Sequence, residues 1–162
     1  MAAGRHYTGT IDAKGRLILP PRLKLLILRH NWGRDLFVTS TTGEAVHIYP
    51  LPLWEDLEKQ LSALAATNPL PKKFLQRTAL WGQSRRMDTR GRIPIPPNLR
   101  ESAALKGRVE LLASPRFAIT VLNRGRLKEL RSSPLFGRHL FETNPADIVE
   151  RLRGGLAHGG SR

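Results

Sequence analysis

The chain has 162 residues and no cysteine, and its 27 Lys and Arg side chains exceed 13 Asp and Glu by a formal net charge of +14. The missing cysteines exclude a disulfide framework, a thiolate zinc site and a cysteine nucleophile. The cationic excess indicates a polyanionic partner. Because the first residues carry no basic-then-apolar leader and no apolar run could span a bilayer, we expect a cytoplasmic protein without a membrane partner.

The first predicted element along the chain is a hairpin that occurs twice. The segment Ile11–Lys24 recurs as Met87–Arg100, at a constant offset of 76 residues. Both copies contain Asp-x-x-Gly-Arg, a proline pair and a following leucine, and Lys14 is matched by the basic Arg90. A match of this length indicates an internal duplication.

Each copy predicts the same local structure. Asp at the first position of a turn accepts a hydrogen bond from the backbone two residues on, and a later Gly tolerates positive φ. The hairpin tips are therefore predicted at Asp12–Gly15 and Asp88–Gly91. The proline pairs end the second strands, and the second proline of each pair suits the first turn of a helix. The predicted strands are residues 6–11, 16–19, 84–87 and 92–95, and the predicted helices are residues 21–30 and 97–104.

Two further strands are predicted in each half, followed by helices. Alternating apolar residues predict strands at 33–39, 46–49, 107–112 and 117–121. Helical apolar spacing predicts linker helices at 52–66 and 71–81, with one more helix at 124–132. One such unit cannot bury both faces of its strands, so we expect both halves to share a closed barrel. The predicted division is 5–51 for the first repeat, 52–82 for a helical linker packed on the barrel, 83–123 for the second repeat, and 124–162 for a short helix with a basic, mobile tail.

The Asp-x-x-Gly-Arg motif, followed by apolar residues, proline and a short helix, resembles the AbrB-type DNA-binding unit. Two copies separated by a helix that begins Tyr49-Pro50-Leu51-Pro52-Leu53-Trp54 resemble the MraZ family, over about residues 5–131. The resemblance implies a mixed α+β, β-rich fold: a pseudo-twofold, swapped-hairpin β-barrel of the double-ψ type with flanking short helices. It also implies a nucleoid-associated transcriptional regulator, expected to be a repressor of the division and cell-wall gene cluster. Such a protein would bind short direct repeats in promoter DNA as a ring-like oligomer.

The repeated motif supplies the candidate DNA-binding residues, because Arg donates two parallel hydrogen bonds to guanine or phosphate and a two-stranded ribbon fits the major groove. The candidates are Arg16, Arg92, Lys14, Arg90 and Arg86. The neighbouring Arg85 is a second candidate for a phosphate contact. Asp12 and Asp88 are expected to hold the turn and orient the arginines, while Gly15 and Gly91 shape the backbone. The alternative is an ordinary hairpin turn with a surface ion pair.

The apolar segment after the first proline pair is a candidate oligomer interface. Helical spacing turns Leu23, Leu26 and Ile27 toward the barrel, so Leu25 and Leu28 are expected to face outward, together with Trp32. The alternative is burial of these side chains beneath the linker helices.

No enzyme motif is present: the sequence lacks a Walker loop, His-Glu-x-x-His and Gly-x-Ser-x-Gly. The five histidines are scattered without metal-ligand spacing, so we expect no metal, cofactor or small-molecule ligand. Two alternative functions remain open. One is an RNA-binding or ribosome-associated accessory protein, against which the 6% aromatic content counts because RNA recognition uses stacking aromatics. The other is an oligomeric scaffold whose charge is incidental.

Overall fold

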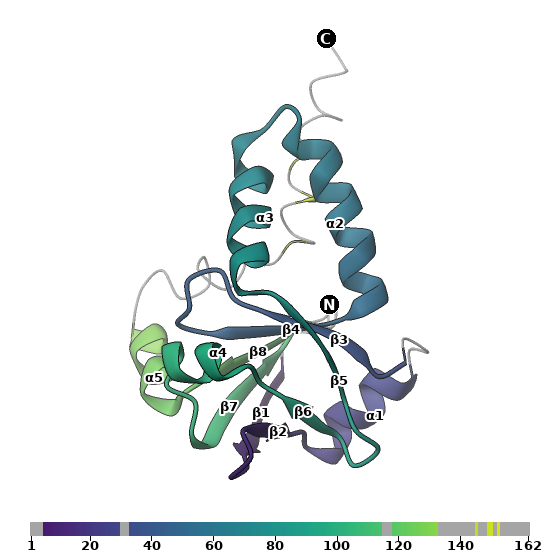
Figure 1. Ribbon diagram of the computed structural model, residues 1–162. Coiled ribbons are helices and arrows are strands. Elements are labelled where there is room, and N and C mark those ends of the chain that lie inside the picture. Colours follow the sequence, from purple (N-terminus) through teal and green to yellow (C-terminus); the bar gives the residue numbers. More distant parts are fainter. Residues whose placement is uncertain are drawn as a thin grey trace.

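The computed structural model describes residues 5–29, 33–114 and 118–132, together with Pro145, Val149, Glu150 and Leu152 (Figure 1). In these residues eight strands form one antiparallel sheet that curls into a nearly closed barrel, accompanied by five helices. The strands are β1 (Arg5–Ile11), β2 (Arg16–Ile18), β3 (Asp35–Thr39), β4 (Val46–Pro50), β5 (Gln83–Arg86), β6 (Arg92–Pro94), β7 (Gly107–Ala113) and β8 (Ile119–Leu122). The helices are α1 (Pro21–Arg29), α2 (Leu51–Ala65), α3 (Pro69–Trp81), α4 (Pro97–Ser102) and α5 (Arg124–Ser132).

The two halves of the chain exchange strands. The sheet order is β5-β3-β4-β8-β7-β1-β2-β6, so β1 of the first half pairs with β7 of the second, and β5 of the second half pairs with β3 of the first. The remaining strand pairs between the halves are β2–β6 and β4–β8. Neither half could form this barrel without the other, because each supplies edge strands that the other needs.

The register of the strands shows a pseudo-twofold relation between the halves. Leu17 and Ile93 are equivalent positions of the repeat, and they lie directly opposite each other in the β2–β6 pair. On the far side of the barrel His47 lies opposite Thr120 in the β4–β8 pair. These two residues occupy equivalent positions as well. His47 pairs with β3, the third strand of the first half, and Thr120 pairs with β7, the third strand of the second half. The pseudo-twofold axis therefore passes through both strand pairs.

The barrel interior is filled by the inward-facing residues of every strand except β5, and by the inner faces of α1 and α4. Fully buried examples are Leu17, Leu36, Ile93, Val109 and Leu111, each with 0% of its surface exposed. The strand and helix predictions are confirmed to within a few residues, and the helix at 124–132 is found at those bounds. The second linker helix begins two residues earlier than predicted, at Pro69 rather than at residue 71. The Asn68 side chain accepts a hydrogen bond from the backbone N–H of Leu70 at 2.9 Å, and proline at the first helical position needs no partner.

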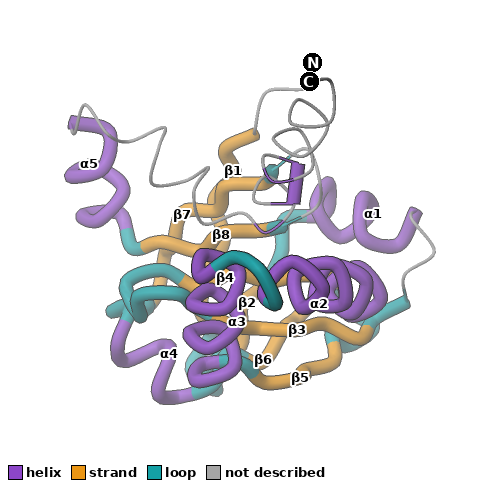
Figure 2. The backbone as a smooth tube through the Cα atoms, turned by 90° about the horizontal axis from the view of Figure 1, so that it is seen from above, coloured by secondary structure: helices purple, strands orange, loops and turns teal. Residues whose placement is uncertain are grey.

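The α2–α3 helical pair extends from the barrel on the side away from β2 and β6 (Figure 1). The ring of Trp54 stacks on Phe37 of β3 with centroids 4.5 Å apart, which fixes the base of α2 to the barrel. At the end of α3, Leu80 is 80% exposed, whereas its neighbour Trp81 packs against the barrel core. Seen from above, both helices lie over the strands of one side of the barrel (Figure 2).

Two described residues of the C-terminal segment contact the helical pair. Val149 is 4% exposed within a cluster that contains Trp54, Leu61 and Phe74, and Leu152 packs against the same cluster. The other residues of the predicted tail, apart from Pro145 and Glu150, lie outside the described residues. Among the helices that the structure describes, none is long and apolar enough to cross a membrane.

Candidate nucleic-acid interface

The first turn, Asp12–Arg16, is built around one carboxylate. Oδ1 of Asp12 accepts hydrogen bonds from the backbone N–H groups of Lys14 and Arg16, both at 2.9 Å, and Oδ2 accepts one from Nε of Arg16 at 2.8 Å. The backbone N–H of Gly15 donates to the Asp12 carbonyl at 3.0 Å and closes the turn. A single side chain thus shapes the turn and fixes the guanidinium of Arg16.

The second turn, Asp88–Arg92, repeats this geometry. Oδ1 of Asp88 accepts from the backbone N–H groups of Arg90 and Arg92 at 2.9 Å, and Oδ2 accepts from Nε of Arg92 at 2.5 Å. The backbone hydrogen bond from Arg92 and then its guanidinium lower the pKa of Asp88 to about 2, and the same contacts from Arg16 lower the pKa of Asp12. Both carboxylates are therefore charged at neutral pH and hold their arginines as ion pairs.

Glycine is required at the same position of both turns. Gly15 and Gly91 have φ of 78° and 79°, in the left-handed region that side chains disfavour. A Cβ at Gly15 would collide with the guanidinium of Arg100, and one at Gly91 would come within 2.9 Å of the Lys24 side chain. The expected backbone role of both glycines agrees with these φ angles.

The two turns lie at opposite ends of one two-stranded ribbon, formed by β2 and β6. The backbone N–H of Leu19, at the end of β2, donates to the Gly91 carbonyl at 3.1 Å, and that of Ile95, at the end of β6, donates to the Gly15 carbonyl at 3.1 Å. About four residues of extended chain separate the turns, or roughly 13 Å. This separation is close to the ~12 Å width of the major groove of B-DNA.

Sequence analysis missed two basic residues of this surface, Lys24 and Arg100. Lys24 on α1 donates from Nζ to the carbonyl oxygen of Thr89 in the second turn at 2.9 Å. Arg100 on α4 lies over Gly15 of the first turn and donates from Nε to the Ile95 carbonyl at 3.0 Å. Each helix of one half therefore places a cation beside the turn of the other half. The signal was present, because these residues occupy the last matched position of the repeat and both are basic.

Arg85 and Arg86 lie on β5, beside the second turn. Arg86 is two-thirds exposed, and its Nε lies 3.9 Å from Oδ1 of Asp35 on the neighbouring strand. Arg85 donates to the Ser84 carbonyl at 2.9 Å and to the side chain of Gln83. Neither residue has the carboxylate-held geometry of Arg16 and Arg92.

The candidate oligomer interface on α1 is open in the single chain. Leu25 and Leu28 are 52% and 43% exposed, so the alternative that the linker helices bury them is wrong. Trp32 lies outside the described residues.

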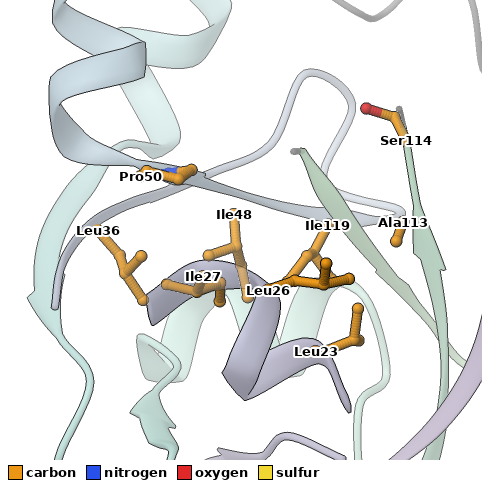
Figure 3. A pocket seen from close by; sticks show the side chains of 9 residues that line it. All are labelled: Leu23, Leu26, Ile27, Leu36, Ile48, Pro50, Ala113, Ser114 and Ile119. Carbon is orange, nitrogen blue, oxygen red and sulfur yellow. The ribbon is translucent and has the colours of Figure 1, made fainter. Parts of the chain in front are cut away.

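The inner face of α1 borders a cavity of about 40 Å³ between this helix and the ends of four strands (Figure 3). It is far smaller than the ~300–1,000 Å³ of usual ligand sites, and apolar side chains dominate its lining. We therefore interpret it as a packing gap between helix and sheet.

The histidines of the described residues take structural positions. His47 is buried and its Nδ1 lies 3.0 Å from the hydroxyl of Thr120; burial lowers its pKa to about 4. His6 lies 2.6 Å from the buried carboxylate of Glu110. Within the part of the chain that the structure describes, no group of three or more His, Asp or Glu side chains could hold a metal ion.

Comparison with known proteins gives a consistent result. The family model described as "MraZ protein, putative antitoxin-like" matches residues 2–77. A protein of Acidobacterium capsulatum named transcriptional regulator MraZ is 39% identical over 129 residues, which are 80% of this chain and 86% of that protein. The protein of the same name from Koribacter versatilis is 38% identical over 135 residues, 83% of this chain and 90% of its own length. That of Thiobacillus denitrificans is 37% identical over 105 residues, 65% and 70% of the two chains.

Proposed function

The chain belongs to the MraZ family of transcriptional regulators, which are not enzymes, and we propose that it represses transcription by inserting the β2–β6 ribbon into the major groove of promoter DNA. The observation that carries this proposal is the pair of identical turns at the two ends of one ribbon. In both turns a carboxylate holds an arginine in one orientation. An arginine fixed before binding loses less side-chain freedom when it meets a base or a phosphate.

The residues of this surface take different roles in the proposal. Arg16 and Arg92, held by Asp12 and Asp88, contact guanine edges, where each bidentate pair is worth about 1–3 kcal/mol of discrimination. The carboxylates orient the arginines and do not contact DNA themselves, because they would be repelled by phosphate. The remaining cations, which contact phosphates, are Lys14, Arg90, Lys24, Arg100 and Arg86.

One ribbon contacts few base pairs, so we propose that specificity comes from several copies of the chain on short direct repeats. Each protomer of a ring-like homo-oligomer would meet one repeat, which raises avidity without new contacts. The outward-facing Leu25 and Leu28 of α1 are the proposed interface between protomers, because exposed neighbouring leucines favour burial. The proposed target is the promoter of the division and cell-wall gene cluster in the cytoplasm, and the bound oligomer would block access to it. The exchange of strands between the halves fits the swapped-hairpin barrel that the AbrB-type resemblance implies.

Fluorescence anisotropy tests this proposal. The probes are the duplex upstream of the protein's own gene and a scrambled duplex of equal composition, at ~150 mM salt, where non-specific binding has a Kd of ~10⁻⁴–10⁻⁶ M. We expect a preference of ~10³-fold or more for the promoter duplex. Equal, salt-sensitive binding to both duplexes would contradict the proposal and leave the net charge of +14 as the only attraction. A preference for structured RNA would favour an RNA-binding role, and an oligomer without nucleic-acid binding would favour a scaffold.

A further inference from the structure

The outer face of the β2–β6 ribbon contains two apolar residues between its arginines. Leu17 and Ile93 are 0% exposed and point into the barrel, so the residues on either side of them point outward. The register places Arg16 opposite Pro94, and Ile18 opposite Arg92. Each arginine of this face therefore has an apolar residue as its cross-strand neighbour.

Ile18 is the larger and more exposed of these two. It is 39% exposed, and it lies directly opposite Arg92 and two residues along the strand from Arg16. Directly opposite side chains have Cβ atoms about 4.5–5.5 Å apart, and residues two apart on one strand are separated by about 6.6 Å. A branched apolar side chain thus stands between two guanidinium groups that carboxylates fix in place.

The surroundings of Ile18 determine what it can contact. A single exposed isoleucine needs no explanation by itself. This one is flanked by cations on a ribbon with the dimensions of the major groove, so the partner that covers it is a polyanion. Duplex DNA presents one apolar group in that groove, the 5-methyl group of thymine. The positive charge beside Ile18 and its apolar side chain therefore both favour duplex DNA as the partner.

We propose that Ile18 is a specificity-determining residue that packs against the 5-methyl group of a thymine beside the base contacted by Arg92. This inference rests on the proposed function, since it requires the ribbon to enter the groove. It also gives the ribbon a direction. Pro94 occupies the equivalent place next to Arg16, but its ring is closed onto its own backbone and reaches less far from the strand. An otherwise twofold-symmetric face thereby distinguishes the two ends of its site, as binding to direct repeats requires.

The test removes the methyl groups from the DNA. Binding is measured by anisotropy to the promoter duplex and to the same duplex with every thymine replaced by deoxyuridine, with wild type, Ile18→Ala and Leu70→Ala. Leu70 is the matched control, because it is an apolar residue 50% exposed on α3, away from the ribbon. We expect wild type and Leu70→Ala to lose at least about fourfold in affinity on deoxyuridine DNA, the value of one buried methyl group. Ile18→Ala is expected to bind both duplexes with the same, reduced affinity.

The outcomes separate this inference from the function on which it rests. If wild type prefers the promoter to scrambled DNA but binds thymine and deoxyuridine duplexes equally, the proposed thymine contact is wrong and the proposed function stands. If Ile18→Ala loses as much affinity as wild type on deoxyuridine DNA, the methyl group is sensed elsewhere and the assignment to Ile18 is wrong. If wild type shows no preference for the promoter duplex, the proposed function fails, and the thymine contact fails with it. Circular dichroism of Ile18→Ala establishes that its fold is retained.

Discussion

The two halves of the barrel are alike at the ribbon and different at their third strands. At the ribbon both turns have the same carboxylate-held arginine and the same glycine φ angle. On the third strands, Phe37 of β3 and Glu110 of β7 occupy equivalent positions, because their partners Ser84 and Thr8 are 76 residues apart. Phe37 stacks on Trp54 of α2, whereas Glu110 contacts His6 of β1.

The difference indicates that the pseudo-twofold symmetry matters at the ribbon and not at the outer attachments of the helices. Phe37 anchors a helical pair to one half of the barrel through aromatic packing. At the equivalent position of the second half, Glu110 is contacted by Nε2 of His6 from β1. Nδ1 of His6 accepts a hydrogen bond from Arg131 of α5 at 3.2 Å, so a polar chain leads to α5 instead. The helix attachments of the two halves can differ without effect on DNA binding. The two turns of a ribbon that meets the twofold-related strands of a duplex are expected to be alike, because equivalent cations then meet equivalent phosphates.

The largest expected effect comes from removing the equivalent arginine of both turns at once. Arg16→Ala with Arg92→Ala removes both groups that are proposed to contact bases, and we expect the proposed ~10³-fold preference for the promoter duplex to be lost. The free energy of unfolding should change little, because both residues are partly exposed. Anisotropy and urea denaturation measure the two effects. Arg77→Ala on α3, an exposed arginine outside the ribbon, is the matched control and should keep the preference. A double variant that still selects the promoter would show that the arginines are only turn supports.

The elements of this fold could largely be predicted from the sequence, whereas their pairing could not. Asp12, Gly15 and the proline pair specify a strand, a turn and a helix through contacts within a few residues, so local chemistry suffices. The pairing of β1 with β7 joins residues about a hundred positions apart, and no local pattern encodes it. For the same reason the cations of α1 and α4 were missed, because each reaches a turn of the other half.

The next effect concerns the far end of the pseudo-twofold axis, where His47 faces Thr120. Burial lowers the pKa of His47 from 6.5 to about 4, so between these values the unfolded chain binds a proton that the folded chain does not. Stability is therefore full above pH 6.5 and is lost as pH falls toward 4, by up to roughly 3 kcal/mol. Urea denaturation across this range measures the slope, and in His47→Gln it should be shallower. An unchanged slope in His47→Gln would contradict the assignment of this loss to His47.

A smaller effect is expected on the unmatched third strand. Phe37→Ala removes the stacking partner of Trp54 and loosens the base of α2. Because Phe37 is only partly buried, we expect the free energy of unfolding to fall by about 2 kcal/mol, below the range for fully buried Phe. Affinity for the promoter duplex should stay unchanged, since this side chain lies away from the ribbon. A loss of specificity in Phe37→Ala would mean that the two surfaces are coupled and that their separation is wrong.

The smallest expected effect distinguishes phosphate contact from support of the turns. Lys24→Met with Arg100→Met removes one cation beside each turn while keeping much of the apolar stem that covers it. If both residues contact phosphates, affinity falls about tenfold at 0.15 M salt for promoter and scrambled DNA alike, and the salt slope decreases by roughly two. If they serve only to hold the turns through Thr89 and Ile95, the preference for the promoter falls instead and the salt slope stays the same.

The matched control is Lys72→Met with Arg77→Met, which removes two exposed cations of α3 outside the ribbon. Any larger loss of affinity in the Lys24 and Arg100 variant is therefore due to the position of these residues. The symmetry of the ribbon also predicts the behaviour of the single variants. Lys24→Met and Arg100→Met should each account for about half of the change in the salt dependence of affinity, because each cation lies beside one of two equivalent turns.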